Sequence, residues 1–290
     1  MEGEQSSGDG GGREFQRVAG ALRTAMTDGT YERGVRLPAQ RDLAKQFGVS
    51  RDTIQRVLKD LADEGWIESR QGSGSVVRKT QQVHSPVGNG AHIGRRITLG
   101  PLVAAAFNAP EVTLDVFTLT SESLDAHIRL QAERVINEEI KPRRIALRLL
   151  LPAETSRLAY PRNQQRPDDP RPLERLNEIS RRHTESLRAA LETLRDGYVP
   201  EVSVEIKHAP LTPNTKLYLL NGVEALHGFY ELIERQVTLA GGQEETILDV
   251  VGLGATMFHF VKDDDPESQG SLFVDAAQAW FDSQWRLLAE

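Results

Sequence analysis

Residues 34–78 constrain the fold of this chain more than any other stretch. They carry, in order, a short amphipathic segment that ends at Gly48, a second helical segment that begins with Ser50-Arg51, and a hairpin pattern tipped by glycines. A segment with helical apolar spacing precedes them from Arg13 onward. This order predicts a winged helix-turn-helix, a fold that presents one helix to the major groove of DNA.

The second helical segment contains the residues expected to read bases. Ser50 is placed to cap the helix through its hydroxyl group. Arg51, Thr53 and Gln55 then fall on the first turns, which enter the groove in such folds. Arginine pairs with two acceptors of guanine, and glutamine pairs in the same way with adenine. The opposite face is apolar and is expected to be core, with Ile54, Val57, Leu58 and Leu61.

Two further positions are expected at the DNA backbone. Arg41 lies at the start of the preceding helix, within reach of a phosphate or a base. Gly72 lies at the tip of the wing, where the missing side chain lets the backbone approach the sugar-phosphate ridge. Trp66 is expected to pack in the core of the wing rather than stack on a base.

The uneven distribution of charge fits a DNA contact made by one part of the chain. The whole chain has a formal net charge of −7, but residues 13–79 hold 13 Lys and Arg against 9 Asp and Glu. A basic head on an acidic body suits a small domain that meets phosphate. The alternative is a winged helix used for protein contacts, with Arg51 and Arg56 merely solvated.

The organisation of the chain is predicted from shifts in composition. Residues 1–12 are polar and rich in Gly and Ser, which is typical of a disordered tail. Residues 13–79 are the winged helix, residues 80–95 form a linker rich in Gly and Gln, and residues 96–290 form the body. The chain has no cysteine and no apolar run of about 18 residues, so we expect a cytoplasmic protein without a membrane segment.

The body alternates between strand and helix patterns. Strands are predicted at 112–119, 145–151, 202–206, 216–220 and 247–251, and helices at 121–140, 173–195, 223–237 and 274–288. This alternation predicts an α/β layered domain after the α+β winged helix-turn-helix. Ser121 is the expected N-cap of the first of these helices.

The N-terminal motifs resemble those of the GntR family of bacterial transcription regulators. Leu37 to Arg41, Gly48 to Thr53 and Gly72 match the spacing of that family's pattern. The resemblance covers about residues 13–78 and implies DNA contacts at Arg41, Ser50, Arg51, Thr53 and Gly72. Gln55 stands where the family often has arginine, so the resemblance does not carry the usual base preference to this position.

One stretch of the body has the frame of the phospholipase D signature, His-x-Lys-x4-Asp-Gly. Lys216 and Gly222 match this frame, while Asn214 and Asn221 replace the histidine and the aspartate. Asparagine cannot act as the covalent nucleophile. The resemblance therefore implies an inactive domain reused as a sensor or as a dimerisation unit, with Lys216, Asn214 and Asn221 as the candidate contacts of an anionic or polar effector. The alternative is a buried strand with chance spacing.

No catalytic or metal-binding constellation emerges from the sequence. The seven histidines never lie at i, i+4 spacing, and no Ser-His-Asp or paired-carboxylate cluster is evident. The favoured function is therefore a transcription regulator that binds double-stranded DNA as a homodimer, without cofactor, and acts as a ligand-responsive repressor on a two-fold operator. The alternatives are a phosphodiesterase-like hydrolase tethered to DNA and an effector-independent DNA binder for plasmid maintenance.

Overall fold

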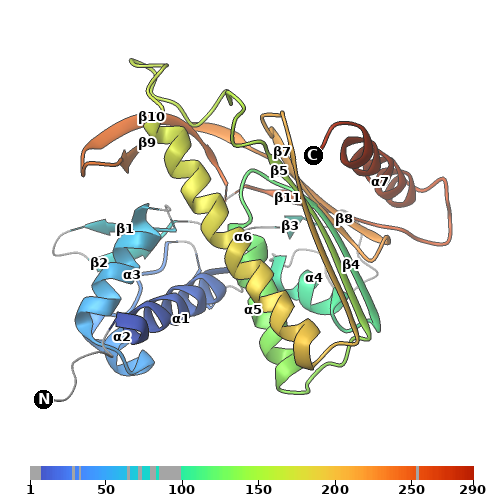
Figure 1. Cartoon of the computed structure of the whole chain (residues 1–290), viewed down its shortest axis with the longest axis horizontal. Helices are drawn as coiled ribbons and strands as arrows, with labels where there is room; N and C mark the ends of the chain where they lie inside the picture. The colour runs from blue at the N-terminus through green and yellow to red at the C-terminus, as the bar shows by residue number, and fades with distance from the viewer. Residues whose placement is uncertain are drawn as a thin grey trace, which may run out of the picture. The chain divides into compact units, whose positions relative to one another are not determined.

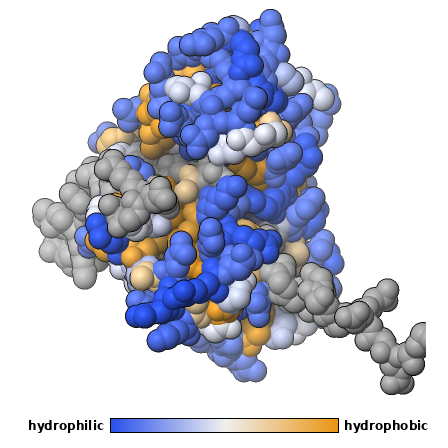
Figure 2. All heavy atoms as spheres, turned by 90° about the vertical axis from the view of Figure 1, so that its left-hand side faces the viewer, coloured by the Kyte–Doolittle hydropathy of each residue, from blue (hydrophilic) through white to orange (hydrophobic). Residues whose placement is uncertain are grey.

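A computed structural model describes residues 8–27, 30–32, 34–63, 66–70, 74–78, 83–84, 99–252 and 255–290. The chain divides into two compact units, Met1–Thr80 and Gln81–Glu290. None of the helices in the described ranges is long and apolar enough to cross a membrane. On the face drawn in Figure 2, hydrophilic side chains predominate and apolar ones show between them in patches.

The first unit is the predicted winged helix. Its elements are α1 (Gly8–Thr27), α2 (Gln40–Phe47), α3 (Arg51–Asp63), β1 (Ile67–Arg70) and β2 (Gly74–Val77), as labelled in Figure 1. The strands β1 and β2 form an antiparallel hairpin in which Ile67 faces Val77. This arrangement confirms the winged helix-turn-helix that the order of motifs predicts.

The core of the first unit comes from the apolar faces of its three helices. Fully buried side chains are contributed by every element, including Val18, Leu22, Met26, Leu43, Ile54, Val57, Leu61 and Trp66. The burial of Trp66 confirms that it packs in the core beneath the wing. Helix α1 begins at Gly8, so residues 8–12 of the expected disordered tail are helical, and residues 1–7 lie outside the described range.

The second unit is built on a seven-stranded sheet with the order β3-β11-β8-β7-β4-β5-β6. The strands are β3 (Val83–His84), β4 (Glu111–Phe117), β5 (Arg144–Pro152), β6 (Glu201–Ala209), β7 (Thr215–Leu220), β8 (Glu224–Phe229) and β11 (Met257–Val261). Strands β4, β5 and β6 are parallel, whereas β7, β8 and β11 continue the sheet in antiparallel fashion. This mixed sheet confirms the predicted α/β layers.

Helices cover both faces of the sheet (Figure 1). The helices are α4 (Leu99–Ala106), α5 (Glu122–Ile136), α6 (Arg171–Gly197) and α7 (Gln269–Leu287). The larger core joins α4, α5 and α6 to one face, with Leu124, Ile128 and Leu187 among its fully buried members. The smaller core joins α7 to the other face through Val274 and Phe281.

A second, two-stranded sheet lies in the same unit. Strands β9 (Glu231–Thr238) and β10 (Glu244–Val251) form a long antiparallel hairpin. The loop between β5 and α6 reaches this hairpin, because Arg162 and Leu248 exchange two backbone hydrogen bonds. The loop and the hairpin are thereby held together beside the sheet.

The helix predicted at 223–237 is wrong, since these residues form strands β8 and β9. Alanine, leucine, glutamate and arginine give this stretch helical propensity, but tertiary pairing overrides such local preferences. Gly228 marks a close approach between two backbone segments of the sheet. A Cβ atom there would lie 2.9 Å from the carbonyl oxygen of Thr256, so the backbone of β11 approaches β8 closely at this point.

Two other expectations change in detail. Ser121 does occupy the N-cap position of α5, but its side chain contacts the hydroxyl of Thr184 at 3.2 Å instead of capping the helix. The predicted linker lies largely outside the described residues. Within it, Val83 and His84 form β3, which pairs with β11.

Candidate nucleic-acid interface

The start of α3 is fixed by the side chain of Ser50. The amide of Thr53 donates to the Ser50 hydroxyl oxygen at 3.1 Å, which satisfies one of the free N–H groups of the first turn. The two hydroxyl groups of Ser50 and Thr53 are also 2.9 Å apart. This local network holds the first turn of α3 in place.

Thr53 does not project toward solvent as predicted. Its side chain is buried, at 7% relative exposure, and its hydroxyl is engaged by Ser50. It lies on the same side of the helix as Ile54 and Val57, where α3 packs on the core. Thr53 therefore has a structural role in the helix cap, and its predicted DNA contact stays a prediction.

Arg51 and Gln55 do project from the exposed face of α3. Within the described part of the chain, no hydrogen bond or ion pair engages either side chain. The flanking Arg56 is exposed as well, and its guanidinium lies 5.4 Å from the ring centre of Phe15 on α1. Two hydrogen-bonding side chains on the first turns thus remain available for an external partner.

Helix α2 presents a second set of basic groups. The side chain of Arg41 is 66% exposed, and its Nε atom lies 3.6 Å from a carboxylate oxygen of Asp42. Such an exposed pair is weak, so a phosphate can displace it at little cost. Gly48 ends α2 in the left-handed conformation with φ of 65°, which sets the turn that leads to α3.

The wing is attached to the loop before α2. Arg36 pairs with Val76, which extends the hairpin by one bridge, and Gly74 has a positive φ of 77°. Gly72 and its neighbours 71–73 lie outside the described residues, so the predicted backbone contact of Gly72 stays a prediction. Exposed cations surround α2, α3 and the wing, at Arg17, Arg36, Lys45, Lys59 and Arg78.

The three residues expected to bind an effector do not meet at one place. Asn214 and Asn221 flank the ends of β7, which puts them about 23 Å apart at a rise of about 3.3 Å per residue. Asn221 has a left-handed backbone, accepts from the amide of Thr113 at 2.9 Å and donates to the carbonyl of Ala106 at 3.1 Å. Its role is to join the end of β7 to β4 and α4.

Lys216 is buried, with 3% relative exposure. Its ammonium donates to the carbonyl of Gly252 and lies 5.3 Å from the ring centre of Tyr230. The Tyr230 hydroxyl bonds to Thr118 and Leu119, and burial raises the pKa of Tyr230 to about 12. This lysine therefore stabilises the packing of β7 against neighbouring segments, which corrects the expectation of an anion-binding site shared with both asparagines.

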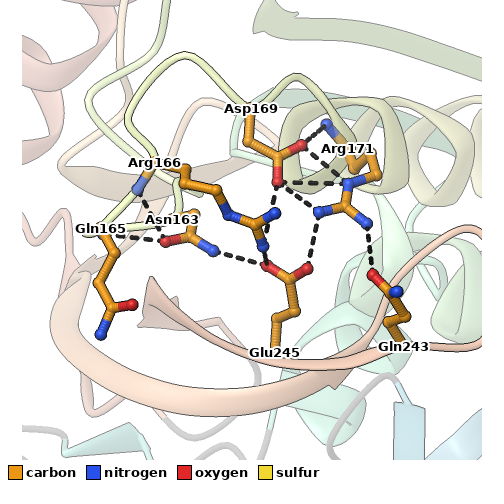
Figure 3. A network of polar contacts seen from close by, with 7 residues as sticks. All are labelled: Asn163, Gln165, Arg166, Asp169, Arg171, Gln243 and Glu245. Carbon is orange, nitrogen blue, oxygen red and sulfur yellow. Dashed lines mark hydrogen bonds and ion pairs between the residues drawn. The ribbon is translucent and has the colours of Figure 1, made fainter.

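Sequence reasoning missed a polar network between the β5–α6 loop and β10 (Figure 3). Glu245 accepts from Asn163 at 2.6 Å and from Arg171 at 2.6 Å, and it also pairs with Arg166. Asp169 accepts from Arg171 at 2.7 Å. These charge-assisted bonds hold the pKa of Asp169 at about 2 and lower the pKa of Glu245.

An open hollow of about 580 Å³ lies beside this network. Most of its lining residues are polar, including Gln164, Gln165, Glu234 and Gln243, and Ile247 also lines it. Within the described residues, no group of three or more His, Asp or Glu side chains is arranged to hold a metal ion. The hollow is thus suited to hydrogen bonding with a polar molecule.

Residues 15–77 match the family model described as bacterial regulatory proteins, gntR family. Over 114 residues the chain is 36% identical to an uncharacterized HTH-type transcriptional regulator of Mycobacterium tuberculosis, covering 34% of this chain and 47% of that protein. Over 65 residues it is 32% identical to the HTH-type transcriptional repressor NagR of Bacillus subtilis, covering 22% of this chain and 27% of that protein. The chain thus spans less than half the length of these relatives.

Among solved structures, the chain resembles the DNA-binding domain of AraR in complex with operator ORX1. The match has 28% identity and a TM-score of 0.22, and it covers 27% of this chain and 90% of that chain. The family match lies within the first unit, which also carries the exposed side chains of Arg51 and Gln55.

Proposed function

We propose that this chain, whose first unit is a winged helix of the gntR family, is a sequence-specific DNA-binding transcription regulator. The observation that carries the proposal is the first turn of α3. Ser50 and Thr53 lock this turn, while Arg51 and Gln55 remain exposed and free of partners within the described residues. A rigid helix start with two outward hydrogen-bonding side chains is what direct reading of bases in the major groove requires.

The exposed cations supply the second part of the interaction. Arg36, Arg41 and Lys45 lie near α3 in the sequence and are exposed, so they are available to phosphate groups. Phosphate contacts fix the register of the protein on the duplex, and base contacts give the specificity. The acidic balance of the rest of the chain is compatible with this role, because only the first unit needs to meet DNA.

We further propose that the regulator is a homodimer on a two-fold operator and a repressor that responds to a polar effector. One winged-helix module buries little surface, so specific binding calls for two copies on repeated half-sites. The hollow beside Glu245 is the candidate effector site, since amide and carboxylate side chains line it. The asparagine at position 214 argues against a phosphodiesterase built on this frame, because it cannot act as the covalent nucleophile.

Footprinting of the full chain on the DNA upstream of its own gene tests the proposal. A protected two-fold sequence that disappears with Arg51→Ala is the expected result. Protection of DNA without a preferred sequence, equal for the original chain and the Arg51→Ala variant, would refute sequence-specific binding. A protected site whose occupancy never responds to metabolite extracts would leave the regulator in place but remove the effector, and would favour the plasmid-maintenance alternative.

A further inference from the structure

The strand β6 forms one edge of the seven-stranded sheet, and within the described residues no backbone bond covers its outer side from Val202 to Ile206. It pairs on one side with β5 over nine residues, from Glu201 opposite Arg144 to Ala209 opposite Pro152. It contains neither a proline nor a break in this register. Proteins normally cover or disrupt such a long edge, because its unpaired backbone groups attract another strand.

The hydrogen bonds at the two ends of β6 show which of its N–H and C=O groups point toward β5 and which point away from it. The amide of Glu201 donates inward to the carbonyl of Arg143, and the carbonyl of Ala209 accepts from Ala153. His208, in contrast, points outward, where it exchanges two bonds with Glu290. Since direction alternates along a strand, the odd-numbered residues bond to β5 and the even-numbered residues face away from it.

Three residues therefore offer outward N–H and C=O groups, namely Val202, Val204 and Ile206. Within the described residues, no backbone bond engages these groups. Their side chains pack only partly against the core beneath α6. They are β-branched, which favours an extended conformation and suits pairing with a further strand.

We propose that β6 pairs with β6 of a second copy, antiparallel, about a two-fold axis at Val204. In this register Val202 faces the partner's Ile206, and each Val204 faces its counterpart. The three facing pairs each exchange two hydrogen bonds, so every free outward group of these residues is satisfied. The two sheets then become one continuous sheet, with a closed, self-complementary interface.

The side chains on the other face of β6 select the same register. Ser203 falls opposite the partner's Glu205, and Glu201 falls opposite the partner's Lys207. Within the protomer Glu201 pairs with Arg144, and the Lys207 ammonium donates to the carbonyls of Trp285 and Ala289. A shift of the axis by one residue would set Glu205 against the partner's Glu201 or against the partner's Glu205, which is repulsive. The avoidance of like charges at Glu205 and the count of backbone bonds thus agree on Val204 as the centre.

This inference names the surface of the homodimer and rests on the proposed function only for the expectation that the chain is dimeric. A charge series at Ser203 in the full chain tests it by sedimentation. Ser203→Glu places like charges opposite each other twice in the dimer, and Ser203→Lys places opposite charges there. The dimer Kd should differ roughly tenfold or more between these two variants, and adding Glu205→Lys to Ser203→Glu should restore the affinity.

Hydrogen exchange gives a readout that does not depend on substitution. The amides of Ser203, Glu205 and Lys207 should be protected at all concentrations, because they donate to β5. Those of Val202, Val204 and Ile206 should become protected only as the dimer forms. A dimer in which these three amides still exchange freely overturns the proposal, as does a chain that stays monomeric at high micromolar concentration or equal Kd values in the charge series.

Neither measurement involves DNA, so the two proposals can fail separately. Protection at β6 in a protein that ignores operator DNA would contradict the regulator and leave the interface standing. Specific operator binding by a dimer without protection at β6 would contradict the interface alone.

Discussion

Replacement of Arg51 should change the affinity for DNA while leaving the stability of the first unit almost unchanged. The side chain is exposed at the first position of α3, and no described residue pairs with it. Arg51→Ala should therefore alter the free energy of unfolding by no more than about 0.5 kcal/mol. Any larger loss of DNA affinity then belongs to the interface and not to the fold.

The size of that loss follows from the bonds that arginine makes. A bidentate pair with guanine contributes about 1–3 kcal/mol of discrimination, which is about 5- to 150-fold in Kd for one half-site. Arg51→Lys keeps the charge but loses the planar fork, so it should lose specificity while nonspecific affinity is retained. Lys45→Ala should weaken binding to all sequences alike and lower the salt slope by about 1.

Fluorescence anisotropy with the footprinted half-site and a scrambled duplex, each at several salt concentrations, measures all three variants. The expected pattern is a loss of specificity for both Arg51 variants and a uniform loss for Lys45→Ala. If Arg51→Ala weakens both duplexes equally, Arg51 contacts phosphate and the base-reading role is refuted. If it changes neither, the first turn of α3 does not enter the groove.

Three further predictions concern stability, each measured by denaturant or thermal unfolding. Ser50→Ala should lower the free energy of unfolding by about 1–2 kcal/mol, because it removes the cap and leaves the Thr53 hydroxyl buried without its partner. The double variant Ser50→Ala with Thr53→Val should lose less stability than Ser50→Ala alone. Equal losses in the two variants would contradict the pairing of the two hydroxyl groups. Burial lowers the pKa of His227 in the folded protein, so the free energy of unfolding should fall as the pH drops below about 6.5. His227→Phe should reduce this loss of stability in acid. An unchanged dependence of stability on pH would show that His227 does not contribute to it. Asn221→Ala should lower the free energy of unfolding by about 1–3 kcal/mol, because two hydrogen bonds are lost and alanine is strained at the φ of 53°. Asn221→Gly should cost less, because glycine adopts this φ without strain and only the hydrogen bonds are lost. A larger loss for the glycine variant would rule out a contribution of the backbone conformation.

The winged helix was predictable because its signals are local. The cap of Ser50, the turn at Gly48 and the apolar face of α3 lie within a few residues of one another, and each agrees with the others. Thr53 shows the limit of this reasoning. Its place in the first turn suggested a groove contact, but the same position allows its hydroxyl to turn inward to Ser50, and only the packing of α3 decides between the two.

The body was harder to predict because its decisive contacts are distant in sequence. Strand β8 forms where helical propensity is high, because its residues pair with β7 on one side and β11 on the other. The network around Glu245 joins this residue to Arg171, 74 positions away, and no spacing in the sequence reveals that pairing. Lys216 illustrates the opposite error, because a familiar spacing suggested a site where the side chain instead serves the core.

The network around Glu245 contributes to the stability of the body and also lies beside the candidate effector hollow, so its response to pH bears on both. Arg171 and Arg166 lower the pKa values of Asp169 and Glu245 in the folded protein, so the unfolded chain binds protons more readily than the native state. The stability that Asp169 contributes is therefore complete above its ordinary pKa near 3.8 and is lost as the pH falls toward about 2. Asp169 and Glu245 stay ionised throughout the neutral range, and Glu245 lies in the lining of the hollow with its carboxylate bound by guanidinium and amide groups. The β5–α6 loop and Arg171, the first residue of α6, are joined to β10 by these polar bonds, by the Arg162–Leu248 bridge and by apolar packing of Leu158 and Tyr160 against Val250. The same loop leads directly into α6, which packs against the proposed dimer edge β6 in the larger core of the body.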